Sequence, residues 1–103
     1  MTETVISVNG IAIRLTDERW AHITEEHSEL AGRRFQVLET IAEPNKIYEG
    51  GNEESLAVRE IETGKFLVVV YRELQVDGFI ITAFLTRRVK SLEKRNLLWS
   101  PPK

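Results

Sequence analysis

Two histidines, His22 and His27, lie on one short segment of the chain, RWAHITEEHSEL at residues 19–30. They are the only histidines in the sequence. Because the ordinary pKa of histidine is about 6.5, an imidazole can accept or donate a proton near neutral pH. The pair is compatible with acid–base catalysis, with a metal site, or with two structural residues of a helix.

The spacing of the two histidines bears on these alternatives. The segment is expected to be helical from about residue 17 to residue 30, with Thr16 as the N-cap. At about 100° per residue, His27 falls in the apolar stripe with Ile23, whereas His22 falls on the charged flank. Metal ligands on one helix are normally four residues apart, so a spacing of five disfavours zinc binding by this pair. His27 is then either a buried or half-buried core histidine or an imidazole facing a cleft over the sheet. His22 is either a solvated residue or a reachable titrating group.

Two threonines in the last long strand-like segment, FIITAFLTRR, could contact a phosphate. Residues of a strand alternate between its faces, so Thr82 and Thr86 are expected on one face together with Ile80. Arg87 is expected on the opposite face. Threonine is also an ordinary strand former, so this pattern has a purely structural interpretation as well.

Two arginines, Arg59 and Arg72, fall within the preceding strand-like segments. A covered arginine needs either a carboxylate or an anionic ligand. Both residues are therefore either cross-strand partners of glutamates or phosphate-binding groups.

Composition describes one ordinary globular domain. The 103 residues are 42% hydrophobic and 29% charged, and they include no cysteine, which excludes disulfides and thiolate metal sites. The longest apolar run, FLVVVY at residues 66–71, is far shorter than a membrane helix, and the N-terminus lacks the pattern of a signal peptide. We therefore expect a cytoplasmic protein without membrane contact.

Charge is unevenly distributed along the chain. The net charge is −2, but residues 87–103 hold six basic residues against one acidic residue, and residues 1–86 hold eight against fifteen. This asymmetry indicates either a polyanion-binding end or a solvated last helix and tail.

The order of elements predicts an α+β fold in a single domain, residues 1–103. Residues 1–15 form a β-hairpin around Asn9-Gly10, the preferred pair of a type I′ turn. Residues 17–43 form two helices that end before Pro44. Residues 46–90 form an antiparallel meander because their connections are short. Residues 91–103 form a short helix and a basic tail. The expected architecture is two helices packed on a four-stranded antiparallel sheet.

Several motifs occur in a recognisable order: RWAHITEEHSEL after RLTD, IAEP leading to IY, then LVVVYRE and IITAFLTRR. Over about residues 14–88 the chain resembles the small phage- and plasmid-associated branch of the barnase, EndoU, colicin and RelE-like nuclease superfamily. The strand pair is also similar to BrnT-like toxins of toxin–antitoxin modules.

The resemblance implies a metal-independent ribonuclease in which the 2′-hydroxyl of the substrate attacks the adjacent phosphate. By position, His22 and His27 would be the acid–base groups, with the hydroxyl of Thr82 or Thr86. Phosphate binding would fall to the arginines, since a guanidinium is suited to bidentate contact with a phosphate. The matching positions are Arg59, Arg72 and Arg87.

The leading hypothesis is a small ribonuclease of the toxin type that needs no metal or cofactor. The alternative is a non-catalytic binding or oligomerisation module in which strand edges or the Leu97-Leu98-Trp99 cluster mediate association. A metal hydrolase would require a third ligand, which is not found at suitable spacing. The candidate partners are RNA, a cognate antitoxin protein and a second copy of the chain.

Overall fold

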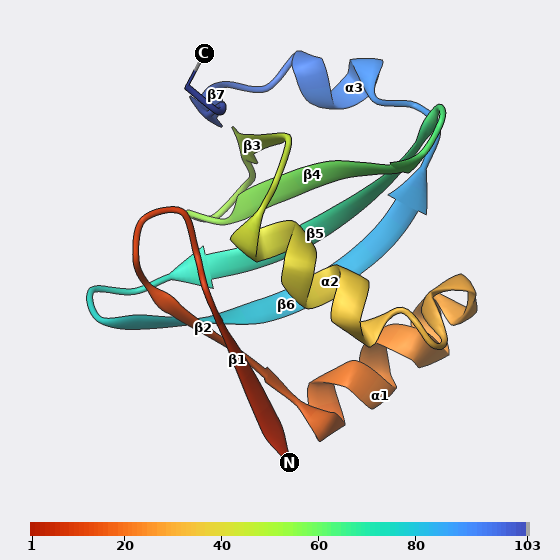
Figure 1. The fold of residues 1–103 in the computed structure, drawn as a ribbon, viewed down its shortest axis with the longest axis vertical. Coiled ribbons are helices and arrows are strands. Elements are labelled where there is room, and N and C mark those ends of the chain that lie inside the picture. Colours follow the sequence, from red (N-terminus) through yellow and green to blue (C-terminus); the bar gives the residue numbers. More distant parts are fainter. Residues whose placement is uncertain (103) are drawn as a thin grey trace.

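The computed structural model describes residues 1–102, so Lys103 of the expected basic tail lies outside the described residues. Its frame is one seven-stranded sheet with the strand order β1-β2-β6-β5-β4-β3-β7 (Figure 1). The strands are β1 (Thr2–Ile6), β2 (Ala12–Thr16), β3 (Lys46–Glu49), β4 (Ser55–Glu62), β5 (Lys65–Glu73), β6 (Asp77–Thr86) and β7 (Leu97–Trp99).

The expected four-stranded antiparallel sheet is wrong, although the α+β class holds. The meander of β3, β4, β5 and β6 is present, but it is extended at both edges. On one side β2 pairs in parallel with β6, so the N-terminal hairpin becomes part of the sheet. On the other side β7 pairs with β3, where a short helix and a basic tail were expected. The sheet is therefore mixed rather than antiparallel.

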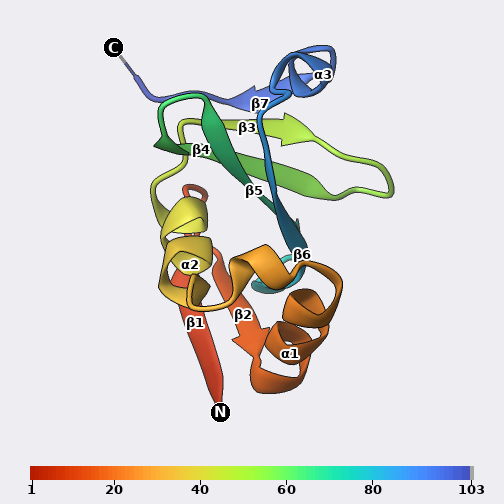
Figure 2. The same cartoon turned by 90° about the vertical axis from the view of Figure 1, so that its right-hand side faces the viewer.

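The helical layer covers one face of this sheet (Figure 2). It consists of α1 (Asp17–Glu26), the 3-10 turn η1 (Ser28–Leu30) and α2 (Arg34–Ala42). Ile23, Leu30 and Ile41 are fully buried against apolar residues of the sheet, such as Val69 and Ala83. This layer forms the larger of the two apolar cores.

The opposite face of the sheet has a smaller core. The short helix α3 (Lys90–Glu93) covers part of it, with Leu92 packed among the side chains of β3, β4 and β5. Phe66, Phe84 and Val89 are only partly buried at the margin of this cluster. We call this side of the sheet the α3 face.

The first helix, α1, begins at the residue that the sequence predicted. Thr16 is the N-cap, and its hydroxyl accepts a hydrogen bond of 3.0 Å from the backbone N–H of Arg19. Its end differs from the expectation, because the helix stops at Glu26 and His27 is its C-cap, with φ −130° and ψ 74°. His27 therefore does not follow the helical stripe of Ile23.

The N-terminal hairpin uses a different turn from the one predicted. In the loop between β1 and β2 only Gly10 has a positive φ, at +80°, so the turn is not of type I′. The N–H of Gly10 donates to the carbonyl of Ser7, and the N–H of Ser7 donates to the carbonyl of Ile11. This is a three-residue loop in which glycine supplies the left-handed position.

A bulge changes one of the predicted strand faces. Tyr71 is opposite Ile80 and Val70 is opposite Thr82, so β6 holds one extra residue between these pairs. Ile80 therefore faces the helices together with Ala83, whereas Thr82 and Thr86 stay on the α3 face. The expectation that Ile80 shares a face with the two threonines is wrong.

Within residues 1–102, no helix is long and apolar enough to cross a membrane.

Candidate functional site

His22 lies on the exposed side of α1. Its Nε2 is 2.6 Å from Oε1 of Glu26, one helical turn later, and both side chains are 57% exposed. His22 also lines a polar hollow of about 300 Å³ with Thr16, Glu18 and Arg19. An imidazole held by a carboxylate and placed near a guanidinium is a possible proton-transfer group, but the same contact is common as a surface ion pair.

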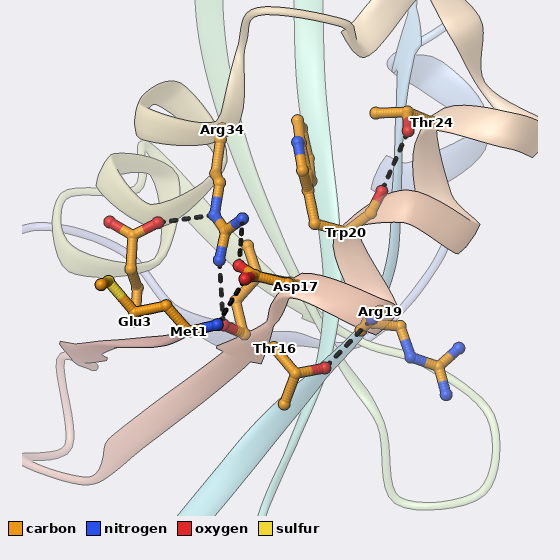
Figure 3. A network of polar contacts seen from close by, with 9 residues as sticks. Met1, Glu3, Thr16, Asp17, Arg19, Trp20, Thr24 and Arg34 are labelled. Atoms are coloured by element: carbon orange, nitrogen blue, oxygen red, sulfur yellow. Dashed lines mark hydrogen bonds and ion pairs between the residues drawn. The ribbon is translucent and has the colours of Figure 1, made fainter.

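The start of α1 is anchored by a network of charged groups (Figure 3). The N-terminal ammonium of Met1 donates to the carboxylate of Asp17. Nη1 of Arg34 lies 2.9 Å from Oδ1 of Asp17. The buried Nε of Arg34 contacts Glu3 as an ion pair rather than through a directed hydrogen bond. The hydrogen bond from the ammonium, followed by that from Arg34, holds the pKa of Asp17 below its usual value. The network joins β1, α1 and α2 and has a structural role.

His27 lies beside β6 rather than in the core. Its backbone N–H donates to the carbonyl of Ile23 at 2.8 Å, and its side chain is 31% exposed. The imidazole ring packs against the ring of Phe84, with centroids 6.2 Å apart and planes at 39°. Its Nδ1 is 3.7 Å from the carboxylate of Glu29. One side of the ring packs and the other faces solvent, so His27 is half-buried, which the first of the two alternatives from sequence allowed.

Thr82 and Thr86 flank Phe84 on the α3 face of β6, and all three side chains are half-buried. Neighbours on one face of a strand are about 7 Å apart, so the three residues form a short row. The hydroxyl of Thr86 accepts a hydrogen bond of 3.0 Å from the N–H of Arg88. We call Thr82, Phe84 and Thr86 the β6 row. Among residues 1–102, no strand pairs with the outer edge of β6 after Phe79, and there Nη1 of Arg19 donates to the carbonyl of Ile81 at 3.3 Å.

Arg59 and Arg72 do not join this row. Arg59 is on the helix-covered side, where its guanidinium donates to the carbonyl of Glu43 at 2.8 Å and lies 3.9 Å from Glu39. Arg72 is on the α3 face, paired with Glu53 at 2.8 Å. It is opposite Phe79, roughly 20 Å along β6 from Thr86. Both arginines pair with glutamates, as one alternative from sequence proposed, but these glutamates lie on α2, at its end and in a loop, and not on a neighbouring strand.

Arg87 opens a cluster of basic residues directly after β6. Arg87, Arg88, Lys90 and Lys94 are all exposed, and together with Val89 and Ser91 they line a hollow of about 470 Å³. None of the four forms an ion pair with a carboxylate of the described chain. We call this site the basic hollow.

A second pocket lies next to the basic hollow on the α3 face. It measures about 260 Å³ and shares Val89 with the hollow. Tyr48, Val58 and Phe66 supply its apolar wall. Its polar rim consists of Asn45, Lys46, Glu60 and Glu93. Phe66 is directly opposite Thr86 in the sheet, so this aromatic pocket is continuous with the end of the β6 row.

Tyr71 has a perturbed pKa but belongs to the interior. Its side chain is 1% exposed, and burial, reinforced by the charge of Glu73, raises the pKa of its phenol, while a hydrogen bond with Ser55 opposes that effect. Glu73 in turn accepts hydrogen bonds from Ser7 and from Asn9, the latter at 2.8 Å. This cluster fixes the hairpin loop to the end of β5.

The structure thus brings together only part of the predicted site. Thr82 and Thr86 lie on β6, His27 packs beside them against Phe84, and Arg87 follows the end of the strand. His22, Arg59 and Arg72 lie elsewhere. Sequence reasoning did not single out Arg88, Lys90 and Lys94 as site residues. The signal that could have found them was the excess of basic residues after residue 86.

In the part of the chain that the structure describes, no group of three or more His, Cys, Asp or Glu side chains is arranged to hold a metal ion.

Comparison of the chain with protein-family models, with curated proteins and with solved structures finds no match. The resemblance to the RelE-like nucleases therefore stays a prediction.

Proposed function

We propose that this protein binds single-stranded RNA across the basic hollow, the adjoining aromatic pocket and the β6 row. The observation that carries the proposal is the basic hollow itself. Four cationic residues line it without a carboxylate partner in residues 1–102, on a chain whose net charge is −2. Like charges repel one another, so an arrangement of this kind is stabilised by a bound anion.

Aromatic side chains beside the basic hollow favour a nucleic acid over other polyanions. Single strands bind where cationic grooves follow the backbone and aromatic rings stack on the bases. Phe66 and Tyr48 wall the pocket that shares Val89 with the hollow, and Phe84 lies two residues before Thr86. A phosphate in the hollow and a base in the aromatic pocket would therefore be neighbours along one strand.

The size of the aromatic pocket favours a single strand over a duplex. At about 260 Å³ it has room for one ring system, which can enter only when the base is unpaired and unstacked. RNA is preferred to DNA because the sequence resemblance implies a ribonuclease.

Cleavage of the bound RNA is the second part of the proposal, and His27 is the group best placed for it. It is the histidine beside Phe84, and Thr82 lies on the same face of β6. As a base, its imidazole would take the proton of a 2′-hydroxyl, and as an acid it would return a proton to the leaving 5′-oxygen. His22, on the outer side of α1, would reach the same strand only if the RNA crossed the helix.

A cytoplasmic location and a cognate antitoxin protein belong with this proposal, since both follow from the predicted toxin-type ribonuclease. If the protein binds RNA without cleaving it, it is the non-catalytic binding module that the sequence offered as the alternative.

The proposal is tested by fluorescence anisotropy with a labelled single-stranded RNA, the same RNA annealed to its complement, and a DNA strand of equal sequence. The single-stranded RNA should bind about tenfold or more tightly than the duplex, with affinity that falls as salt rises. Equal affinity for strand and duplex would mean that the aromatic pocket takes no base. Absence of binding at low salt would refute the proposal.

A further inference from the structure

The sheet ends in two strands whose outer edges have no partner within residues 1–102. β1 pairs only with β2, and β7 pairs only with β3. Figure 1 shows these two strands at opposite ends of the molecule. An open strand edge presents unpaired backbone N–H and C=O groups, which can accept a further strand.

The β1 edge is apolar and acidic. Ile6 is 56% exposed, and Phe35 of the adjoining α2 is 74% exposed. Val5 and Phe35 help to line a groove of about 340 Å³ between β1 and α2. The lining of the groove holds three carboxylates and no basic side chain: Glu3, Glu39 and Glu43. Two arginines outside the lining pair with them, Arg34 with Glu3 and Arg59 with the other two, so these groups together keep one excess negative charge. Glu43 is 74% exposed, and its nearest cation, Arg59, is 3.7 Å away.

The β7 edge is apolar and basic. Leu97 and Leu98 are 51% and 54% exposed, which is high for leucines in a strand. Lys94 and Arg95 lie just before this strand, separated from it only by Asn96, and are exposed. The guanidinium of Arg95 is held near β3 by a hydrogen bond of 3.4 Å to the carbonyl of Glu49.

We propose that β7 of one copy of this chain adds to the β1 edge of the next copy. Three edge pairings are available to identical chains, and two of them bring like charges together: β1 with β1 and β7 with β7. Only the pairing of β1 with β7 brings the acidic groove against the basic strand. It also covers Phe35 and the exposed leucines, which a solitary chain leaves in water.

This contact is heterologous, so it leaves one free edge at each end of every assembly. Such contacts produce open chains of copies unless rotation closes a ring. β7 has only three residues, so few backbone hydrogen bonds form at each contact. The association is therefore weak and depends on protein concentration and on salt.

Sedimentation velocity over a range of protein concentrations tests this contact, using wild type, Glu43→Lys and Arg95→Glu. Wild type should show an average mass that rises continuously with concentration. Each single variant should lose most of that rise, because each brings like charges together at the contact. An equal mixture of the two variants should regain it, because the reversed edges are again complementary.

The matched controls are Glu25→Lys, on the exposed side of α1, and Arg33→Glu, before α2, which should both associate like wild type. Thermal melting of each variant checks that it is folded. A monomeric wild type, a rise that stops at a dimer, unchanged association in the two test variants, or failure of their mixture would each overturn the proposal. None of the substituted residues lines the basic hollow, so the result is independent of RNA binding.

Discussion

The imidazole of His27 and the phenyl ring of Phe84 pack against each other at the outer edge of β6, with ring centroids 6.2 Å apart. His27 reaches this position because α1 ends one residue before it. The packing gives a titratable ring a fixed place on the same strand that leads to the basic hollow.

This placement predicts different consequences for the two histidines. In the presence of a chelator, His27→Ala should reduce RNA cleavage by about 100-fold, the usual contribution of a general acid or base. His22→Ala should leave cleavage within about threefold, since His22 lies on the outer side of α1. Gel analysis of a labelled RNA measures both rates. A larger loss for His22→Ala would place the chemistry in the polar hollow at the start of α1 instead.

Phe84 should contribute to binding through its ring. Phe84→Leu keeps an apolar side chain of moderate size in the partly buried cluster but removes the flat surface for stacking. We expect about a tenfold loss of affinity for single-stranded RNA, within the range for stacking of one base on an aromatic side chain. Anisotropy titration measures the loss, and circular dichroism shows whether the fold is kept. Unchanged affinity would remove Phe84 from the proposed RNA surface.

Strand β6 lies very close to both β5 and β2 at a glycine. A Cβ at Gly78 would lie 2.3 Å from the carbonyl oxygen of Arg72 and 2.7 Å from Cδ1 of Ile13. Gly78→Ala should therefore lower the free energy of unfolding by about 1 to 3 kcal/mol. Gly51→Ala is the matched control, because a Cβ there meets nothing within 4 Å, and it should change stability by less than about 0.5 kcal/mol. Urea denaturation compares the two, and equal effects would contradict the close approach at Gly78.

The network around Asp17 predicts a dependence of stability on pH. The pKa of Asp17 is lowered in the folded chain from its usual value of 3.8. Its charged form therefore stabilises the fold above that value, and the contribution disappears as pH falls through the lowered pKa. The melting temperature of wild type should exceed that of Asp17→Asn at pH 6. The difference should shrink as pH falls below 3.8. A difference that grows toward low pH would show that the network acts in another way.

The sequence carries local signals for the parts of the fold that depend on near neighbours. Thr16 is an N-cap because its hydroxyl reaches an N–H three residues later, and Gly10 marks a hairpin because its φ is positive. The pairing of β2 with β6 joins residues 65 positions apart, such as Ala12 and Asp77. No short sequence pattern predicts a pairing between such distant residues. The bulge that turns Ile80 toward the helices could not be predicted from the sequence either, because strand alternation assumes an unbroken register.

In the candidate site too, features set by near neighbours could be predicted and features set by distant residues could not. Thr82 and Thr86 share a face because the strand between them is regular, and this local prediction is confirmed. The partners of Arg59 and Arg72 are carboxylates that only the folded chain brings near. The basic residues after Thr86 were visible as a charge excess, but their arrangement around one hollow depends on how α3 turns back over the sheet.

Binding of RNA at the basic hollow can be tested with a pair of charge reversals in that hollow. Lys90→Glu with Lys94→Glu should weaken binding of single-stranded RNA by about tenfold or more and reduce the slope of log affinity against log salt by about 1.4, since each lost phosphate contact removes about 0.7. Arg33→Glu with Arg72→Glu, an equal change of charge away from the proposed RNA surface, should leave both quantities close to those of wild type. Equal weakening by the two double variants would contradict the account, because binding would then follow net charge and not the basic hollow.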